Sequence, residues 1–208
     1  LEGLSLGQRL ERGGRARRTV AAQALTICRQ IAVALAAAHD KGVVHRDLKP
    51  ENVMLIEDAL APGTERVKIL DFGLAKIYAE ASPASAGSGQ TSTGAIMGTP
   101  AYMAPEQCRS LQKADGQSDV YSLGVMLFEM LAGQLPFIDE DVVRLLLKIR
   151  KEPLPLLSSY GVQVPDYVTQ ALARALSKRK EDRFPSVLDF ARALYGLPSG
   201  LARSRAEP

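Results

Sequence analysis

The stretch from residue 43 to residue 55 places the tightest constraint on what this chain can fold into. It reads Val-Val-His-Arg-Asp-Leu-Lys-Pro-Glu-Asn-Val-Met-Leu, so two short apolar runs flank a polar loop. Asp47 could take a proton, Lys49 could neutralise a negative oxygen, and Asn52 could offer its side-chain oxygen to a metal. A second carboxylate, Asp71, follows another apolar run. An acid, a cation and two oxygen ligands are what phosphoryl transfer from a magnesium nucleotide requires.

The polar loop belongs to a set of three motifs: His45-Arg46-Asp47-Leu48-Lys49-x-x-Asn52, then Asp71-Phe72-Gly73, then Ala104-Pro105-Glu106. In this order and spacing they resemble the Hanks-type serine/threonine protein kinases, in particular the eukaryotic-like kinases of bacteria. The resemblance implies a mainly α fold: a protein-kinase-like C-terminal lobe with a small β-hairpin at the catalytic and metal-binding loops. It covers residues 1–196, and residues 197–208 are expected to form a tail or the start of a linker.

The same resemblance implies roles for individual residues, with ATP and Mg²⁺ as the cofactors. Asp47 would be the catalytic base that orients an acceptor hydroxyl, and Lys49 would steady the γ-phosphate. Asn52 and Asp71 would hold magnesium. Met54 would lie under the adenine ring, although its simpler interpretation is a core residue.

Residues 79–95 are rich in Ser, Gly, Ala and Thr, and such a segment cannot bury enough apolar surface to order itself. A flexible linker is one interpretation. Its position between the second and third motifs resembles a kinase activation loop, which makes Thr91 and Thr93 candidate phosphorylation sites. A phosphate there could pair with Arg46. Thr99 is expected to shape the acceptor pocket and, together with the lysine of the polar loop, to favour Ser/Thr over Tyr substrates.

The resemblance also implies residues that hold these loops in place. Asp119 would brace the backbone near His45 and Arg46, and it would be costly in an apolar helix unless hydrogen-bonded. Glu106 and Arg183 would form a buried brace in which removing one partner is expensive. The full set of bracing residues is His45, Phe72, Gly73, Glu106, Asp119 and Arg183.

Apolar periodicity predicts a series of amphipathic helices and two strands. The first long helix is expected to begin with a Thr19 cap and to stop at a left-handed Gly42. The opening residues 1–18 are similar to the segment after the kinase hinge, where a short helix begins. The other helices are expected at 115–133, 139–151, 165–176 and 185–194, the last two with Pro in the first turn, and the strands at 53–56 and 66–70.

Composition excludes several classes of function. The net charge of +3 is too small to argue for nucleic acid binding. Cys28 and Cys108 form no C-x-x-C pair, which favours a reducing, cytoplasmic location. No signal peptide is evident, and no membrane segment is expected, because the best apolar run, residues 120–131, falls short of the roughly 20 residues a span needs. The expected partners are proteins with Ser or Thr acceptors, with self-association for autophosphorylation as a further possibility.

The sequence also departs from the family pattern. It contains no G-x-G-x-x-G loop and no strand-borne lysine before the polar loop, so the N-lobe is expected to be absent. We therefore expect a serine/threonine kinase in the complete protein and little or no activity in this chain alone. A non-catalytic, pseudokinase-like binding or regulatory module is the alternative, and a magnesium-dependent hydrolase is a remoter one.

A second departure from the family pattern lies at residues 178–180. They read Lys-Arg-Lys where relatives often have Lys-Asp-Pro, and they are expected to form an exposed basic cluster.

Overall fold

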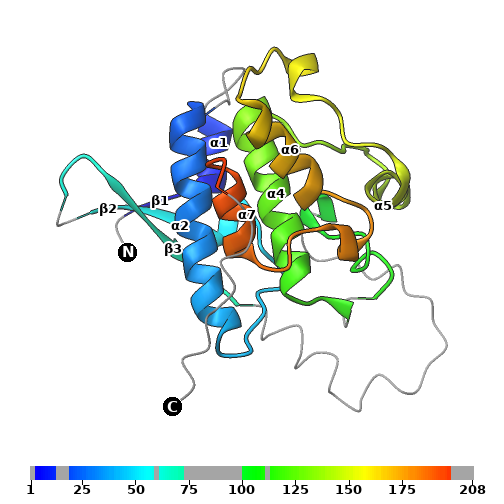
Figure 1. The fold of residues 1–208 in the computed structure, drawn as a ribbon, viewed down its shortest axis with the longest axis horizontal. Coiled ribbons are helices and arrows are strands. Elements are labelled where there is room, and N and C mark those ends of the chain that lie inside the picture. Colours follow the sequence, from blue (N-terminus) through cyan, green and yellow to red (C-terminus); the bar gives the residue numbers. More distant parts are fainter. Residues whose placement is uncertain (1–2, 13–18, 59–60, 73–99, 111–112, 198–208) are drawn as a thin grey trace.

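A computed structural model describes residues 3–12, 19–58, 61–72, 100–110 and 113–197. The fold is mainly helical with one small sheet (Figure 1). Its strands are β1 (Leu4–Ser5), β2 (Val53–Glu57) and β3 (Glu65–Ile69), and its helices are α1 (Leu6–Arg12), α2 (Ala21–His39), α4 (Gly116–Ala132), α5 (Val142–Lys151), α6 (Asp166–Ala175) and α7 (Val187–Ala193). Short 3₁₀ turns occupy Pro50–Asn52, Pro100–Tyr102, Leu157–Tyr160 and Lys180–Asp182.

Helix α4 forms the centre of the core. Nearly every residue from Ser118 to Ala132 is buried, as its all-round apolar character predicts. It packs against α2, α6 and α7, and Figure 1 shows α2 and α4 running side by side. Gly124 allows the close approach of α6, because a Cβ there would lie 3.2 Å from the Leu176 side chain. The Asp115 side chain caps the start of α4, so the first turn is polar and the rest of the helix is apolar.

Helix α2 lies against α4, α7 and β3. Gly42 has φ of 75°, which confirms the predicted left-handed stop just beyond the helix. The predicted Thr19 cap is wrong: Val20 is the N-cap residue without a side-chain hydrogen bond, and the Thr19 N–H instead donates to the Met130 carbonyl at 2.7 Å. That bond ties the start of α2 to the last turn of α4.

Helix α2, and not residues 120–131, is the stretch that resembles a membrane span. Its 19 residues are long and apolar enough to cross a bilayer by length and composition alone. Core helices of soluble proteins meet the same criterion, and one face of α2, with Ile27, Ile31 and Leu35, is buried in the common core. The search for uninterrupted apolar runs did not identify α2 as such a stretch. Its many alanines raise the mean hydropathy of the helix without forming a strong apolar stripe.

The predicted hairpin is present, and the structure extends it to a sheet in the order β1-β2-β3. Strands β2 and β3 are antiparallel, with Val53 opposite Ile69 and Glu57 opposite Glu65. The short β1 pairs with the other edge of β2 and places Ser5 opposite Met54. Strand β1 could not be predicted, because a two-residue strand has no periodicity. Two further details differ: Pro165 is the N-cap residue of α6, and Pro185 precedes the Ser186 cap of α7, so neither proline lies in the first turn.

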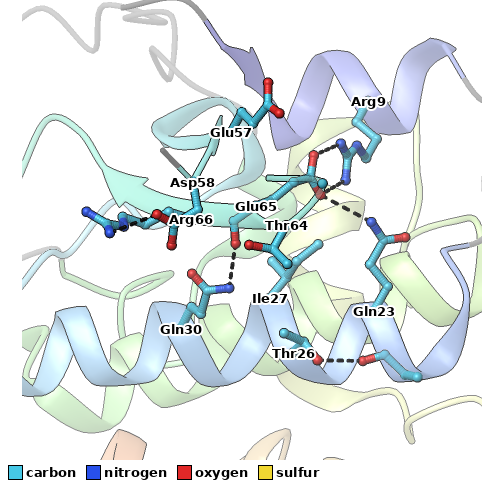
Figure 2. Close-up of a pocket in the computed structure, with 12 residues that line it drawn as sticks. Arg9, Gln23, Thr26, Ile27, Gln30, Glu57, Asp58, Thr64, Glu65 and Arg66 are labelled. Atoms are coloured by element: carbon cyan, nitrogen blue, oxygen red, sulfur yellow. Dashed lines mark hydrogen bonds and ion pairs between the residues drawn. The ribbon is translucent and has the colours of Figure 1, made fainter. Parts of the chain in front are cut away.

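The outer edge of β3 is closed by a side chain. The Gln30 amide donates to the Glu65 carbonyl at 2.9 Å and accepts from the Val67 N–H at 2.8 Å, so it takes the place of a neighbouring strand. Figure 2 shows Gln30 reaching the sheet from α2, on one side of an open groove of about 840 Å³. Arg9 and Gln23 also bond the Glu65 carboxylate across this groove. The sheet that carries the polar loops is thereby fixed to α1 and α2.

Replacing Gln30 with Leu should destabilise the hairpin by about 2 kcal/mol, since it removes two hydrogen bonds and leaves two strand groups unpaired. The Val67 amide should lose its protection from hydrogen exchange, and urea unfolding should give the change in free energy. Gln23→Leu is the matched control, because its 3.2 Å bond to Glu65 is exposed and its loss should cost under about 0.5 kcal/mol. Unchanged exchange at Val67 in the Gln30 variant would contradict this account of the sheet edge.

Candidate active site

A buried carboxylate holds the polar loop, residues 45–52, against helix α4. Asp119 lies in the first turn of α4 and is 1% exposed. Its Oδ2 accepts hydrogen bonds from the His45 backbone N–H at 2.9 Å and from the His39 ring at 2.7 Å, and its Oδ1 accepts one from the Arg46 N–H at 3.0 Å. These donors replace the water that the carboxylate loses on burial. The backbone just before Asp47 is therefore anchored to the core helix.

Arg46 has a left-handed backbone, with φ of 65°. A bulky residue in this conformation costs of the order of 1–3 kcal/mol and persists only when its surroundings impose it. Both of its peptide groups are held: the N–H donates to Asp119, and the carbonyl accepts from the Gln107 side chain at 2.8 Å. Gln107, just past the third motif, is 4% exposed, and its Oε1 also accepts from the Ala104 N–H at 2.9 Å. The third motif therefore helps to set the geometry of the first.

The His45 side chain connects the polar loop to the segment after β3. Its Nε2 lies 3.0 Å from the Leu70 carbonyl, its Nδ1 lies 3.4 Å from the Asp47 N–H, and its ring packs against Phe72 at 4.9 Å between centroids. Both polar contacts are satisfied only when Nε2 carries the proton and Nδ1 is an acceptor. His45 thus joins the first and second motifs inside the fold.

The acid and the cation of the polar loop lie side by side. Lys49 Nζ is 3.3 Å from Asp47 Oδ2, and the Asn52 amide donates to the Asp47 carbonyl at 2.9 Å. Both charged side chains are partly exposed, at 26% for Asp47 and 19% for Lys49. They line a small cleft together with Arg46, Leu48, Tyr102, Met103, Gln107 and Ser122. The acid can therefore reach a hydroxyl presented at the surface beside the third motif.

Two candidate oxygen ligands, Asn52 and Asp71, flank the base of the hairpin. The Leu70 N–H donates to the Asn52 carbonyl at 2.8 Å, which continues the pairing of Val53 with Ile69 and brings Asp71 beside the polar loop. Asp71 is exposed, with φ of 50°. Because Nδ2 of Asn52 is used on the backbone, Oδ1 is its remaining ligand atom. An amide oxygen and a carboxylate suit Mg²⁺, which keeps several waters and is commonly completed by substrate phosphates. Among the described residues, no group of three or more His, Cys, Asp or Glu side chains is arranged to hold a metal ion.

Met54 lies on β2, one residue past the start of that strand, and is half-buried opposite Ser5 of β1. Its side chain is therefore neither fully in the core nor free on the surface. This position is compatible with both interpretations made from the sequence, a core residue and a wall of an adenine pocket.

The third motif is joined to the C-terminal helices by a buried ion pair. The Arg183 guanidinium, with a fully buried side chain, makes two hydrogen bonds to the Glu106 carboxylate, at 2.8 and 2.7 Å. It also donates to the backbone carbonyls of Ser177 and Gln117. Partial burial opposes ionisation of Glu106, but its bonds from Arg183 and Ser118 hold the pKa of this carboxyl below its ordinary value.

Several residues of the site gave no clear signal in the sequence. The ring of His39 donates to the buried Asp119 carboxylate. The Tyr102 hydroxyl donates to Glu129 at 2.6 Å, and the Tyr102 carbonyl accepts from Ser122 at 2.8 Å. Such long-range polar contacts leave no periodic pattern. Four residues singled out from the sequence, Gly73, Thr91, Thr93 and Thr99, lie outside the described residues.

Comparison with known proteins gives a consistent set of relatives. The family model described as a protein kinase domain matches residues 2–189. Serine/threonine-protein kinase Pkn1 of Myxococcus xanthus is 42% identical over 171 residues, which are 82% of this chain and 23% of that protein. Serine/threonine-protein kinase PknL of Mycobacterium tuberculosis (strain ATCC 25618 / H37Rv) is 36% identical over 178 residues, 86% of this chain and 41% of that protein.

Solved structures agree with these sequence relatives. The crystal structure of the Mycobacterium tuberculosis PknI kinase domain matches with a TM-score of 0.66 and 27% identity, over 94% of this chain and 63% of that one. The chain thus spans less than half the length of the curated relatives named above and about three-fifths of this solved domain.

Replacing Glu106 with Gln should destabilise the fold by about 3 kcal/mol at neutral pH, because it leaves a buried guanidinium without its counter-charge. The folded-state pKa of Glu106 is lowered, so the contribution of the pair is complete above the ordinary carboxyl pKa of about 4.3 and is lost as the pH falls through the folded-state value. The stability difference between the natural chain and the variant should therefore shrink in acid, as measured by urea unfolding at each pH.

Glu181→Gln is the matched control for this experiment. Glu181 is exposed and lies 3.7 Å from Arg179, so its loss should change stability by less than about 0.5 kcal/mol at any pH. Equal effects of the two substitutions would show that the Glu106–Arg183 pair does not stabilise the fold.

Proposed function

The chain belongs to the protein kinase family, and on that premise we propose that it is the C-lobe portion of a serine/threonine protein kinase domain. In the complete protein, the γ-phosphate of ATP would be transferred to Ser or Thr hydroxyls of protein substrates. The observation that carries this proposal is the placement of a partly exposed Asp47 beside Lys49, with the backbone just before Asp47 anchored through Asp119. Serine/threonine specificity rests on the relatives and on Lys49.

Each described side chain has a task in this reaction. Asp47 orients the acceptor hydroxyl and accepts its proton, while Lys49 offers a positive charge to the oxygens of the transferred group. Asn52 and Asp71 would hold Mg²⁺, which supplies charge neutralisation of the nucleotide phosphates when bound. The Lys49–Asp47 contact of 3.3 Å keeps the cation next to the acid before either meets a substrate. Most of the catalytic effect then comes from positioning and electrostatics.

We propose that the nucleotide side of this site is completed by a second lobe. The sequence contains no Gly-rich phosphate loop and no strand-borne lysine. The described residues supply acceptor-side and metal-side groups, with Met54 on β2 as the candidate contact for adenine. The chain alone would therefore bind partners more readily than it would turn over ATP. A non-catalytic binding module is for this reason the second candidate function of the isolated chain. Cys28 and Cys108 are free thiols, which suits a reducing compartment such as the cytoplasm. Autophosphorylation between copies of the protein can occur there.

We also propose that Arg46 responds to phosphorylation at Thr91 or Thr93. The supporting observation is its buried Nε, which has no hydrogen-bond partner in the part of the chain that the structure describes. An unpaired buried donor is costly, and a phosphate oxygen would satisfy it with a charge-assisted bond. The neighbouring Asp47 would then be ordered together with Arg46.

Asp47→Asn in the full kinase domain should lower kcat by at least about 100-fold and leave nucleotide affinity unchanged, because the amide cannot accept the hydroxyl proton. Phosphate transfer to a Ser/Thr protein such as casein and binding of a fluorescent nucleotide would measure the two effects. Asp166→Asn, an exposed position on α6, is the matched control.

The 208-residue chain alone should show no turnover above that of the Asp47 variant. Robust Mg²⁺-dependent turnover by this chain would refute the need for a second lobe.

Thr91→Ala and Thr93→Ala together should lower the activity of the full domain, by about 10-fold for one lost charge-assisted contact. Arg46→Gln should give a similar loss, and combining all three changes should add little, since they remove the same interaction. Mass mapping after autophosphorylation would locate the phosphate. An active enzyme in which both threonines stay unmodified would remove this regulatory role.

A further inference from the structure

A basic cavity lies beside the third motif. It has a volume of about 430 Å³, within the range of ligand-binding pockets, and is lined by Pro105, Glu106, Arg109, Arg150, Lys151, Lys178, Arg179, Lys180 and Glu181. Six of these side chains are cationic and two are acidic, so the lining carries a net charge of +4. The cations come from three separate segments: the turn after the third motif, the end of α5, and the stretch between α6 and α7.

The positive charge of this cavity is only partly compensated. Lys180 pairs with Asp115 at 2.9 Å, and Arg179 lies 3.7 Å from Glu181. Arg109, Arg150 and Lys151 form no ion pair with any described residue. The Glu106 carboxylate does not offset them, because its charge is already met by two bonds from Arg183. Cations left unpaired around a concave surface favour an anionic ligand.

Lys178 is a partly buried cation of this cavity. The sequence predicts an exposed residue, but Lys178 is half-buried: its Nζ donates to the Ile149 carbonyl at 2.7 Å and sits 4.1 Å from the centre of the Phe137 ring. Burial, opposed by Glu152 and reinforced by the nearby Arg183 cation, lowers its pKa to about 8. An anion in the cavity would stabilise its protonated form.

The cavity and the cleft around Asp47 are lined by neighbouring residues of one segment. Tyr102, Met103 and Gln107 line the cleft around Asp47, while Pro105 and Glu106 of the same segment line the basic cavity. The Cα atoms of Met103 and Pro105 can be no more than about 7 Å apart, since extended chain spans at most about 3.6 Å per residue. An extended polypeptide with a hydroxyl at Asp47 could therefore reach the cavity within roughly three to six residues.

We propose that the basic cavity binds a phosphate group carried by a polypeptide substrate, so that this kinase favours substrates already phosphorylated a few residues from the acceptor. The inference rests on the proposed function for its substrate class. A phosphate monoester carries a charge of about −1.5 to −2 and three acceptor oxygens, which matches cations converging from three segments better than a single carboxylate does. Arg109 and Arg150 can each engage it in a bidentate manner.

Two other uses of the cavity fit the structure less well, and the groove of Figure 2 is a poorer candidate for the anion site. Cys108 lies near Arg150 and Lys178, but burial raises the pKa of its thiol to about 11, so the cations do not create a reactive thiolate. The groove of Figure 2 holds no comparable charge, because Arg9 and Glu65 pair across it. A nucleic acid would need a long basic track, whereas this cavity is confined to three short segments.

Fluorescence anisotropy with the full chain, without ATP, tests the proposal. The probe is a labelled neutral peptide with one phosphothreonine roughly four residues from a serine, compared with the same peptide carrying threonine. The phosphopeptide should bind at least about 10-fold more tightly. Arg109→Gln/Lys151→Gln should abolish this preference, and both positions are exposed, so the fold should be kept and thermal unfolding can verify it. Arg29→Gln/Arg144→Gln, also exposed, removes the same charge elsewhere and should change binding less than about twofold.

The competing outcomes are distinct. Equal affinity for the two peptides would overturn the proposal. Inorganic phosphate competing as well as the phosphopeptide would reduce the cavity to a free-anion site, and tighter binding of an oligodeoxythymidine through the same residues would make it a nucleic acid surface. Both outcomes overturn the polypeptide assignment. Because binding is measured without turnover, an inactive protein can still show the preference, and an active kinase can lack it.

Lysine acetylation followed by mass spectrometry gives a second, independent measurement. The phosphopeptide should protect Lys151 and Lys178 and leave the exposed Lys41, remote in sequence and outside the cavity, at its unprotected rate. Equal rates with and without phosphopeptide at all three lysines would place its binding outside the cavity.

Discussion

A single buried carboxylate, Asp119, carries the geometry of the whole site. Placing an ionised group in an apolar helix is unfavourable unless fixed donors replace its lost water, and here the donors are the backbone of the polar loop and the ring of His39. The loop supplies the hydrogen-bond donors that the buried carboxylate needs, and the carboxylate in turn sets the backbone conformation of the loop. Helix α4 combines a polar first turn, with Asp115, Ser118 and Asp119, and an apolar body that locks it in the core. The site therefore inherits the rigidity of the most buried element of the fold.

The three motifs are far apart in sequence but form one connected polar network. His45 reaches the Leu70 carbonyl, Gln107 reaches the Arg46 carbonyl, and Ser118 donates to Glu106, which Arg183 holds from the C-terminal side. Each link joins a backbone group or charge that would otherwise be buried without a partner. The arrangement explains why Asp47, the proposed metal ligands and the third motif keep fixed relative positions although only the hairpin connects them locally.

Periodicity in the sequence was sufficient for the helices and the hairpin, because a buried apolar stripe leaves a repeating signature along one segment. It was insufficient where the deciding contact crosses the fold. Thr19 looked like a cap but uses its backbone on Met130, Lys178 looked exposed but lies over Phe137, and β1 was too short to have a period. Gln30 and Gln107 are ordinary polar residues in the sequence, yet both complete backbone hydrogen bonding of other segments. The motif residues were recognisable because their chemistry demands particular types in a particular order; their supporting partners only have to supply a donor or an acceptor.

The left-handed backbone of Arg46 has a consequence for how this position can vary. Glycine would suit its φ of 65° better than any side chain, so the position sacrifices conformational stability to keep a guanidinium beside the acid. Substitution by glycine would relieve the backbone and, at the same time, remove the group proposed to bind phosphate. If Arg46 has the proposed role, a screen for thermal stability alone would select against it, and stability and activity would trade off directly at position 46.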